Sequence, residues 1–330
     1  MPEKIIIGNK IINKNSPVFV IAEIGLNHNG KLEIAKKLIE AAKESGADAV
    51  KFQTYKTENF VHPIYGKTQY EILKKYELSF EKFKELKEFA DKIGIIFLSS
   101  PFDFESVDFL YKIGVKAFKI ASSELSNLYF VKYIASKELP MFISTGLHNY
   151  YEIKKSLTQI EKINKKIILL HCISEYPLSF ENANLNSIPF LNEKFGYIVG
   201  FSDHSDGFIL DIIAVSLGAK VIEKHFTLSR KLQGPDHKIS LEPSELKEMI
   251  KNIRIVEKAL GKFGKGITKK EQQIKNLALK GIYAAKDIEK GEIIKFEKIK
   301  LLRPKIRRNL ILEKILGKSS FRRVKRMEPF

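Results

Sequence analysis

The sequence has only one cysteine, Cys172, among its 330 residues, which excludes an intrachain disulfide. A single thiol is typical of proteins from a reducing compartment. No apolar run approaches the roughly 20 residues that a membrane-spanning helix needs. The first residues, MPEKIIIGNK, lack the long apolar stretch of a secretion signal. We therefore expect a soluble, cytoplasmic protein with no membrane partner.

Acidic residues are fewer than basic ones. The chain has 57 Lys and Arg and 39 Asp and Glu, a formal net charge of +18. Such an excess fits a lysine-rich solvated surface, an anionic small substrate or a polyanion such as nucleic acid. Basic residues are spread along the whole chain, which favours the solvated surface and predicts no nucleic-acid partner. Only the end of the chain is locally dense in them: Arg303, Lys305, Arg307, Arg308, Arg322, Arg323, Lys325 and Arg326.

Polar side chains occur at the end of nearly every apolar, strand-like run in the first two thirds of the chain. These residues are Glu23, Lys51, Gln53, Ser99, Ser100, Lys119, Ser122, Ser144, Thr145, His171, Ser202, Asp203, His204, Glu223 and His225. Segments with helical spacing of apolar residues separate the runs, so neighbouring strands must be parallel. This repeat predicts an α/β fold, a (β/α)8 TIM barrel whose strand ends meet at one mouth, and therefore an enzyme.

The domain organisation follows from the length of the chain. A TIM barrel takes about 250 residues, and the last barrel helix is expected from Pro243 to Gly261. The glycine-rich segment 261–266, GKFGKG, is interpreted as a linker. We therefore predict a catalytic barrel over residues 1–266 and a small, separate, mostly β module over residues 267–330.

Two histidines are candidate metal ligands. His204 and His225 end the seventh and eighth predicted strands, which are adjacent when the barrel closes. Glu223 lies two residues before His225 and on the same face. A histidine after a strand can instead simply hydrogen-bond a loop, but two on neighbouring strand ends favour a metal site. Two imidazoles with oxygen ligands suit Mn, Fe, Co or Zn.

Two lysines lie inside predicted strands, where lysine is rarely buried without a partner. Lys51 and Lys119 could instead extend to the rim of the barrel. Together with the hydroxyls of Ser100, Ser122, Ser144 and Ser202 they predict a cationic, donor-rich site for phosphate and carboxylate. Beside a divalent metal, such a site fits carbon–carbon bond formation from a small phosphorylated acid. It also fits a metal-dependent phosphoesterase.

Eight motifs then occur in order along the chain. They are AEIGLNHNG (22–30), GADAVKFQTY (46–55), SSPFDFESVDFL (99–110), KIASSEL (119–125), STG (144–146), EYP (175–177), GFSDH (200–204) and EKHFTL with GPDHKISLEP (223–243). Together they resemble the N-acetylneuraminate (sialic acid) synthase family. The resemblance covers almost the whole chain, including a C-terminal module similar to the family's antifreeze-like (SAF) domain.

The resemblance implies a synthase that condenses phosphoenolpyruvate with the open-chain aldehyde of an N-acylated mannosamine-type sugar. The products are a nonulosonic (sialic) acid and phosphate, formed by C–O cleavage through a tetrahedral intermediate. The implied cofactor is a divalent metal, Mn²⁺ before Mg²⁺ or Co²⁺. A legionaminic or pseudaminic acid synthase acting on a diacetamido-trideoxy hexose remains open, as do the phosphoesterase and a polyanion-binding protein that uses the basic tail.

The resemblance also implies roles for individual residues. His204 and His225 match the metal ligands, with Glu124 in the outer shell, and the predicted catalytic residues are Glu23, Lys51, Lys119, Glu124 and Glu223. The implied phosphoenolpyruvate site comprises Lys51, Ser100, Lys119, Ser122, Ser144, Tyr176 and Ser202. Gln53 falls near the reacting centre and Asp236 at a sugar-binding position. Arg303, or its neighbour Arg307, matches an arginine lent to the adjacent subunit, which implies a domain-swapped homodimer.

Overall fold

The computed structural model describes residues 2–262, 264–306 and 311–330. The chain forms two compact units, Met1–Gly261 and Lys262–Phe330. The division falls at the start of the glycine-rich segment 261–266, the predicted linker.

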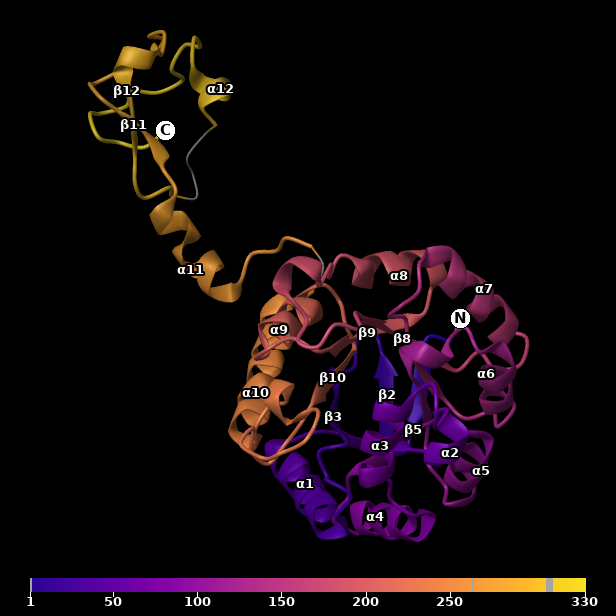
Figure 1. Ribbon diagram of the computed structural model, residues 1–330. Coiled ribbons are helices and arrows are strands. Elements are labelled where there is room, and N and C mark those ends of the chain that lie inside the picture. Colours follow the sequence, from indigo (N-terminus) through magenta and orange to yellow (C-terminus); the bar gives the residue numbers. More distant parts are fainter. Residues whose placement is uncertain (1, 263, 307–310) are drawn as a thin grey trace. The chain divides into compact units, whose positions relative to one another are not determined.

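The first unit is a closed barrel of eight parallel strands in the order β10-β3-β4-β5-β6-β7-β8-β9 (Figure 1). The strands are β3 (Phe19–Gly25), β4 (Ala49–Thr54), β5 (Ile96–Pro101), β6 (Phe118–Ile120), β7 (Met141–Ser144), β8 (Ile167–Cys172), β9 (Ile198–Asp203) and β10 (Val221–His225). The predicted (β/α)8 TIM barrel is therefore confirmed.

Helices surround the barrel and cover its outer face (Figure 1). They are α1 (Leu32–Ser45), α4 (Phe80–Ile93), α5 (Phe104–Lys112), α6 (Leu128–Ala135), α7 (Tyr150–Ile160), α8 (Ser187–Phe195), α9 (Ile209–Ser216) and α10 (Pro243–Leu260). The short helices α2 (Thr57–Phe60) and α3 (Lys67–Tyr76) lie between β4 and α4 and instead pack near the carboxyl ends of the strands, in a separate cluster with Leu26, Tyr55 and Phe102. Helix α10 begins at a proline, and reciprocal bonds between Glu242 and Glu245 cap its first turn. Its apolar residues Leu246, Met249 and Ile253 are buried at helical spacing.

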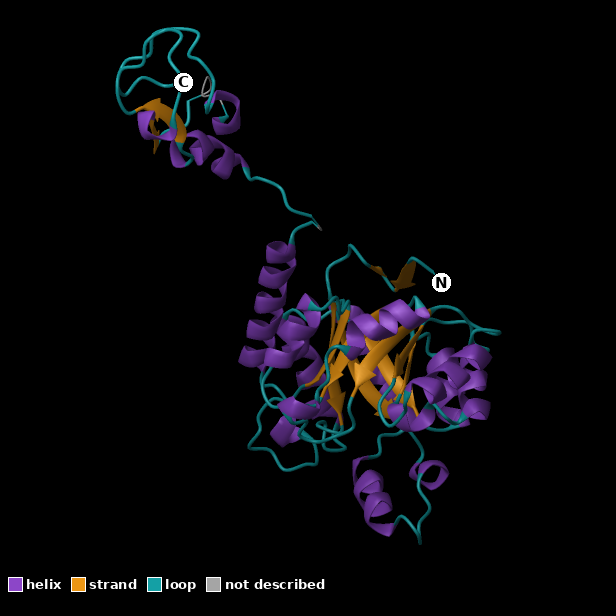
Figure 2. Ribbon diagram, turned by 90° about the horizontal axis from the view of Figure 1, so that it is seen from above, coloured by secondary structure: helices purple, strands orange, loops and turns teal. Residues whose placement is uncertain are grey.

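Side chains that face the barrel interior alternate along each strand, and their character changes from one end to the other. At the amino end the interior is apolar, with Phe19, Leu98, Phe142 and Val221 in one buried cluster. The hairpin of β1 (Lys4–Ile7) and β2 (Lys10–Asn13) adds isoleucines to that cluster and covers this end of the barrel (Figure 2). Polar residues follow only toward the carboxyl ends, so the chemistry of the barrel is confined to that mouth.

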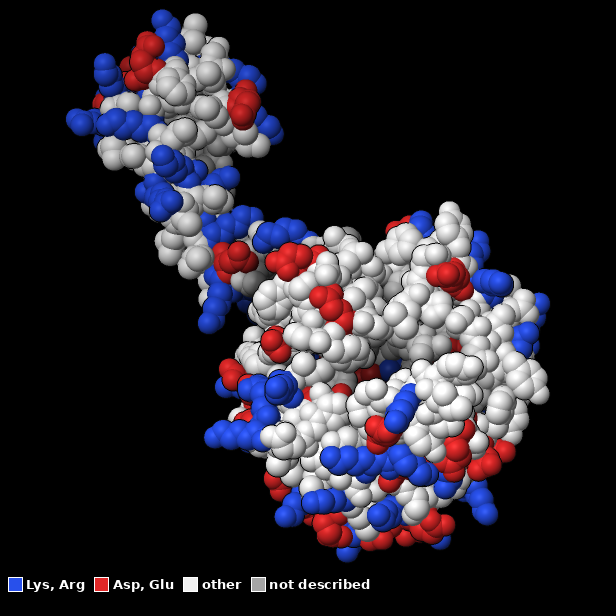
Figure 3. Space-filling model, viewed as in Figure 1, with Lys and Arg blue, Asp and Glu red and all other residues white. Residues whose placement is uncertain are grey.

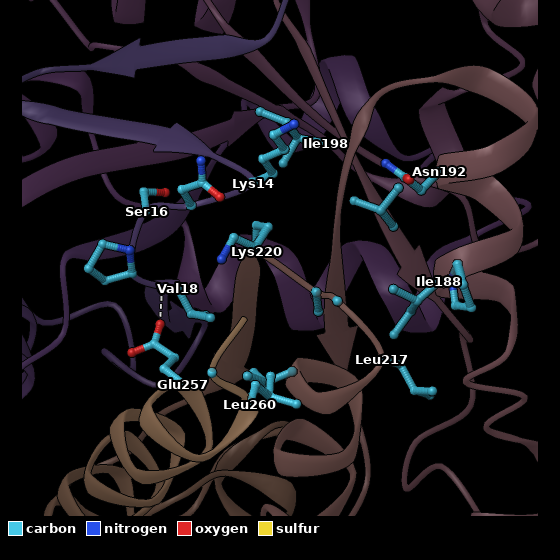
Figure 4. A pocket seen from close by; sticks show the side chains of 18 residues that line it. Lys14, Ser16, Val18, Ile188, Asn192, Ile198, Leu217, Lys220, Glu257 and Leu260 are labelled. Carbon is cyan, nitrogen blue, oxygen red and sulfur yellow. Dashed lines mark hydrogen bonds between the residues drawn. The ribbon is translucent and has the colours of Figure 1, made fainter. Parts of the chain in front are cut away.

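A cavity of about 580 Å³ lies at the amino end, between the loop after β2 and helices α8 and α10 (Figure 4). Its one carboxylate, Glu257, accepts a hydrogen bond from the Val18 amide and is paired with Arg254. None of the predicted site residues lines it. The cavity is therefore separate from the mouth where the predicted site residues gather.

The second unit is small and mainly irregular, with an antiparallel pair of strands. It contains α11 (Lys269–Ala278), β11 (Gly281–Ala284), β12 (Ile299–Leu302) and α12 (Leu312–Ile315). Single β-bridges, such as Ile288 with Val324, extend the pairing around its own buried core of Ile282, Ile294 and Phe330. Within the described ranges of both units, no helix is long and apolar enough to cross a membrane.

Candidate active site

The carboxyl ends of the strands surround a cavity of about 220 Å³. Figure 3 shows acidic and basic atoms at the bottom of this hollow in the barrel mouth. The predicted site residues that line it are Glu23, Lys51, Gln53, Ser100, Lys119, Ser122, Ser144, Tyr176, Ser202, His204, Glu223 and His225. The mouth therefore brings together most of the candidates from the sequence.

Two lysines and two glutamates form a buried ion-pair network in this cavity. Lys51 Nζ lies 2.6 Å from Glu23 Oε2 and 3.7 Å from Glu223 Oε1. Lys119 Nζ donates to Glu223 Oε1 at 2.8 Å. Each of the four side chains is at most 5% exposed, so both lysines are buried with partners rather than extended to the rim.

The two glutamates differ in their tendency to hold a proton. Burial raises the pKa of Glu23 to about 6, and the charge of Lys51 opposes that shift only in part. Burial also acts on Glu223, but Lys119 and Lys51 outweigh it and lower its pKa to about 2. Glu23 can therefore exchange a proton near neutral pH, whereas Glu223 stays ionised and holds both ammonium groups.

Hydroxyl groups complete the polar lining. Ser202 donates to Glu223 Oε1 at 3.0 Å, and Ser100 Oγ lies 3.4 Å from Lys51 Nζ. Ser144 Oγ is buried and has no hydrogen-bond partner. Because buried polar groups are normally paired, an unpaired hydroxyl in the same cavity as two ammonium groups indicates space for an anionic ligand.

The two histidines face each other across the neighbouring strands β9 and β10. Their ring centroids lie 5.6 Å apart, and the Tyr176 ring lies 4.0 Å from that of His204. His204 Nδ1 donates to the Ile173 carbonyl at 2.8 Å, and the same ring hydrogen-bonds the Cys172 thiol. His225 Nδ1 is buried without a partner, and burial together with the charges of His204 and Lys51 holds its pKa well below its usual range. A neutral imidazole is the form that binds metals.

The described residues contain no cluster of three or more His, Cys, Asp or Glu side chains arranged around one metal position. His204 and His225 are therefore the candidate nitrogen ligands for a cation at this position. Solvent or substrate oxygens could complete the coordination of a cation there.

Asp236 and Gln53 lie around Gly25 at the edge of the cavity. A Cβ on Gly25, where φ is +51°, would stand 3.1 Å from Asp236 Oδ2 and 3.6 Å from Gln53 Nε2. Asp236 Oδ2 is also 4.0 Å from His225 Nδ1, and burial raises the pKa of this carboxyl. Asp236 is thus next to the histidine pair, although it does not line the cavity itself.

Glu124 is not among the residues that line the cavity. The Glu124 carboxylate, in a short 3-10 turn over Ser122–Glu124, accepts hydrogen bonds from Ser123 Oγ at 3.1 Å and from Asn127 Nδ2 at 3.4 Å. Arg303 is an exposed residue of the second unit, and Arg307 falls outside the described residues.

The sequence does not single out Cys172, Phe102 or Leu147 as part of the lining, whereas Ser174 is expected near phosphate. Cys172 and Ser174 line the cavity, and a Cβ on Gly146 would stand 2.7 Å from Ser122 Oγ. Strand alternation is the signal for Cys172, because it turns Cys172 inward and His171 outward, where His171 bonds the Ala183 carbonyl at 2.8 Å. Burial alone would raise the pKa of Cys172 and lower that of His204, but their contact reverses both shifts.

Comparison with known proteins identifies relatives along most of the chain. A family model described as the NeuB family matches residues 38–265. The N,N'-diacetyllegionaminic acid synthase of Campylobacter jejuni subsp. jejuni serotype O:2 is 45% identical over 86% of this chain and 90% of its own length. The human N-acetylneuraminate-9-phosphate synthase is 37% identical over 84% of this chain and 81% of its own length.

A solved structure supports the same relationship. The N-acetylneuraminic acid (sialic acid) synthetase from Leptospira borgpetersenii serovar Hardjo-bovis, in complex with citrate, superimposes with a TM-score of 0.79 at 38% identity. The match covers 83% of this chain and 95% of that chain. With its barrel, its polar mouth and these relatives, the chain is an enzyme that belongs to the NeuB family of synthases.

Proposed function

We propose that this enzyme condenses phosphoenolpyruvate with the open-chain aldehyde of an N-acylated mannosamine-type sugar. The products are a nonulosonic acid and inorganic phosphate. One observation carries the proposal: two buried ammonium groups, Lys51 and Lys119, lie in the same cavity as a pair of imidazoles on adjacent strand ends.

The lysine side of the cavity suits the enol phosphate. Lys51 and Lys119 supply charge, and Ser100, Ser122, Ser144 and Ser202 supply hydroxyl donors around them. Hydrogen bonds from ammonium groups to phosphate or carboxylate are among the stronger ones in proteins. Glu223 keeps the two lysines oriented until the substrate anion arrives.

The histidine side fits a divalent cation, with Mn²⁺ preferred over Mg²⁺ or Co²⁺. His204 Nε2 and the unpartnered, neutral His225 would hold it, and open positions would remain for substrate oxygen. When bound, such an ion polarises a carbonyl oxygen as a Lewis acid.

Side chains of this cavity can assist each step of the reaction at C3 and C2 of phosphoenolpyruvate. C3 of phosphoenolpyruvate attacks the aldehyde carbon, the carbonyl π electrons move to the aldehyde oxygen, and C2 is left as an oxocarbenium ion. The aldehyde oxygen becomes a hydroxyl by taking up the proton that water releases in the next step, and the proton of the new C2 hydroxyl leaves with phosphate when the ketone forms. Water adds to C2 while Glu23, whose pKa is raised to about 6, accepts the proton. The tetrahedral carbon expels phosphate by C–O cleavage, and Lys51, Lys119 and the serine hydroxyls stabilise the departing charge. No covalent bond to a lysine is required.

The sugar would occupy the outer part of the mouth, where Gln53, Tyr176 and Asp236 lie. A second candidate is a diacetamido-trideoxy hexose, which would make the product a legionaminic or pseudaminic acid. The 45% identity to a relative named for diacetyllegionaminic acid, against 37% for the one named for N-acetylneuraminate 9-phosphate, favours testing this sugar with equal care.

The second unit and the assembly complete the proposal. We expect the unit after the linker to act as an antifreeze-like domain that lends Arg303 to the active site of a neighbouring subunit in a domain-swapped homodimer. We also expect the enzyme to act in the cytoplasm. The basic side chains at the end of the chain would then serve assembly or solubility rather than a polyanion.

Product mass tests the proposed reaction. The full chain, Mn²⁺ and phosphoenolpyruvate are incubated with N-acetylmannosamine, its 6-phosphate or 2,4-diacetamido-2,4,6-trideoxymannose. We expect a nine-carbon 2-keto acid from at least one sugar, together with equimolar phosphate. Absence of a condensation product with every aldose would contradict the proposal.

A further inference from the structure

A fully buried lysine lies directly behind the histidine pair. Lys224 points away from the cavity, on the face of β10 opposite to Glu223 and His225, and its side chain is 0% exposed. Its ammonium contacts Asp203 Oδ2 and donates to the Ser205 carbonyl at 2.6 Å. Asp211 of helix α9 is the next carboxylate, 4.0 Å away.

The pair joins the two strand ends that carry the histidines. Asp203 immediately precedes His204 and Lys224 immediately precedes His225, and the two residues are register partners on β9 and β10. Asp203 also accepts hydrogen bonds from the Ser205 amide and the Ser205 hydroxyl, both at 2.9 Å. The carboxylate thus braces the backbone on both sides of His204 and ties it to the strand of His225.

Stability alone does not explain this arrangement. Replacing a buried ion pair by apolar residues of similar size is often neutral or stabilising, because burying two charges is costly. Asp211 shows this cost, because burial and the charge of Asp203 raise the pKa of Asp211 well above its usual range. Asp203 is then the one carboxylate that balances the Lys224 ammonium. What such a pair supplies is a defined register between two elements.

We propose that Lys224 and Asp203 are positioning residues that hold His204 and His225 at the separation needed to bind one divalent cation. The inference rests on the cation site of the proposed function. It assigns to this pair no contact with substrate or cation.

Three variants of the full-length protein test the inference. Lys224→Met removes the ammonium, and Lys224→Met/Asp203→Leu removes both charges, so that no unpaired ion is left in the core. The matched control is Glu257→Gln, which disrupts the ion pair with Arg254 at the opposite end of the barrel. Two quantities are measured for each: the Kd for Mn²⁺ by electron paramagnetic resonance, and the resistance to urea with EDTA present.

We expect Lys224→Met and the double variant to bind Mn²⁺ about 10- to 100-fold more weakly, as is usual when a group that orients a metal ligand is lost. The double variant should show this weaker Mn²⁺ binding while its urea midpoint stays near that of the wild type. Glu257→Gln should keep its Mn²⁺ affinity within about twofold, whatever its stability.

A folded double variant with wild-type Mn²⁺ affinity would overturn the positioning role and leave the cation site intact. The wild-type protein and His204→Ala provide the reference for the site itself. If the wild type and His204→Ala bind Mn²⁺ equally, the proposed cation site is refuted, and the positioning role is refuted with it.

Discussion

Lys119→Met is the substitution that most directly probes the buried ion-pair network. Lys119 Nζ donates to Glu223 at 2.8 Å with both side chains 5% exposed. Its removal leaves Glu223 with Lys51 at 3.7 Å and Ser202 at 3.0 Å. Breaking a buried ion pair costs about 3–5 kcal/mol of unfolding free energy. We expect the lower end of that range, because two partners remain.

The same substitution should weaken substrate binding by a separate route. A hydrogen bond to a charged group contributes about 1.5–3 kcal/mol, which corresponds to about a 10- to 150-fold increase in the Kd for phosphoenolpyruvate. Binding of the aldose should change much less. Isothermal titration with phosphoenolpyruvate alone measures the first quantity, and urea unfolding at pH 7.5 measures the stability.

Glu223→Gln separates the two effects. It also breaks the ion pair, but it keeps both ammonium groups and removes the carboxylate that competes with the substrate anion. We expect lower stability with phosphoenolpyruvate binding retained or tightened. The double variant Lys119→Met/Glu223→Gln should regain much of the stability and none of the binding. If Lys119→Met loses stability yet binds phosphoenolpyruvate like the wild type, the network has only a structural role and the reasoning is refuted.

Three further predictions concern other parts of the protein. Burial lowers the pKa of His28 to about 3 from 6.5, so the native state binds fewer protons and loses stability as pH falls from 6.5 toward 3. Urea unfolding should show that His28 causes a loss of about 3 kcal/mol of unfolding free energy between pH 7.5 and 4.5. His28→Asn should abolish this loss, and parallel pH profiles of stability for the two proteins would contradict the prediction. Gly146→Ala places a Cβ 2.7 Å from Ser122 Oγ, 2.8 Å from Ser174 Oγ and 3.2 Å from the Cys172 carbonyl oxygen. We expect a roughly tenfold weaker affinity for phosphoenolpyruvate, whereas an unchanged Kd would place both serines outside the substrate site. Arg303→Ala mixed with His225→Ala should regain activity that neither has alone if the arginine acts across subunits, and a mixture that stays inactive after subunit exchange would argue against the swapped dimer.

Much of the barrel could be predicted from the sequence because parallel strands impose a simple rule. Apolar runs separated by helical spacing must be parallel neighbours, and the polar residue at the end of each run must lie at the mouth. Lys51 and Lys119 could be assigned to the interior because strand positions alternate. The proximity of His204 and His225 followed from closure between the first and last strands of the barrel and the adjacency of the last two.

Other features depend on contacts that no local pattern contains. Lys224 and Asp203 follow the same strand-end pattern as the site residues, and only their outward orientation against helix α9 makes them a buried pair. Alternation along β8 puts His171 and Cys172 on opposite sides of the strand, but the partner of the outward imidazole, the Ala183 carbonyl, is a contact that alternation does not contain. The hairpin β1–β2 covers the amino end of the barrel through its isoleucines, a role that four-residue strands do not indicate by themselves. The role of Arg303 depends on a second subunit.

Phosphate release measured with and without an aldose tests the central claim most directly. The full chain is incubated with Mn²⁺ and phosphoenolpyruvate, and phosphate is followed before and after the sugar is added. The proposed synthase releases phosphate only after addition, in a one-to-one ratio with the 2-keto acid. Phosphate released at the same rate without any sugar would show a phosphoesterase and would contradict the condensation.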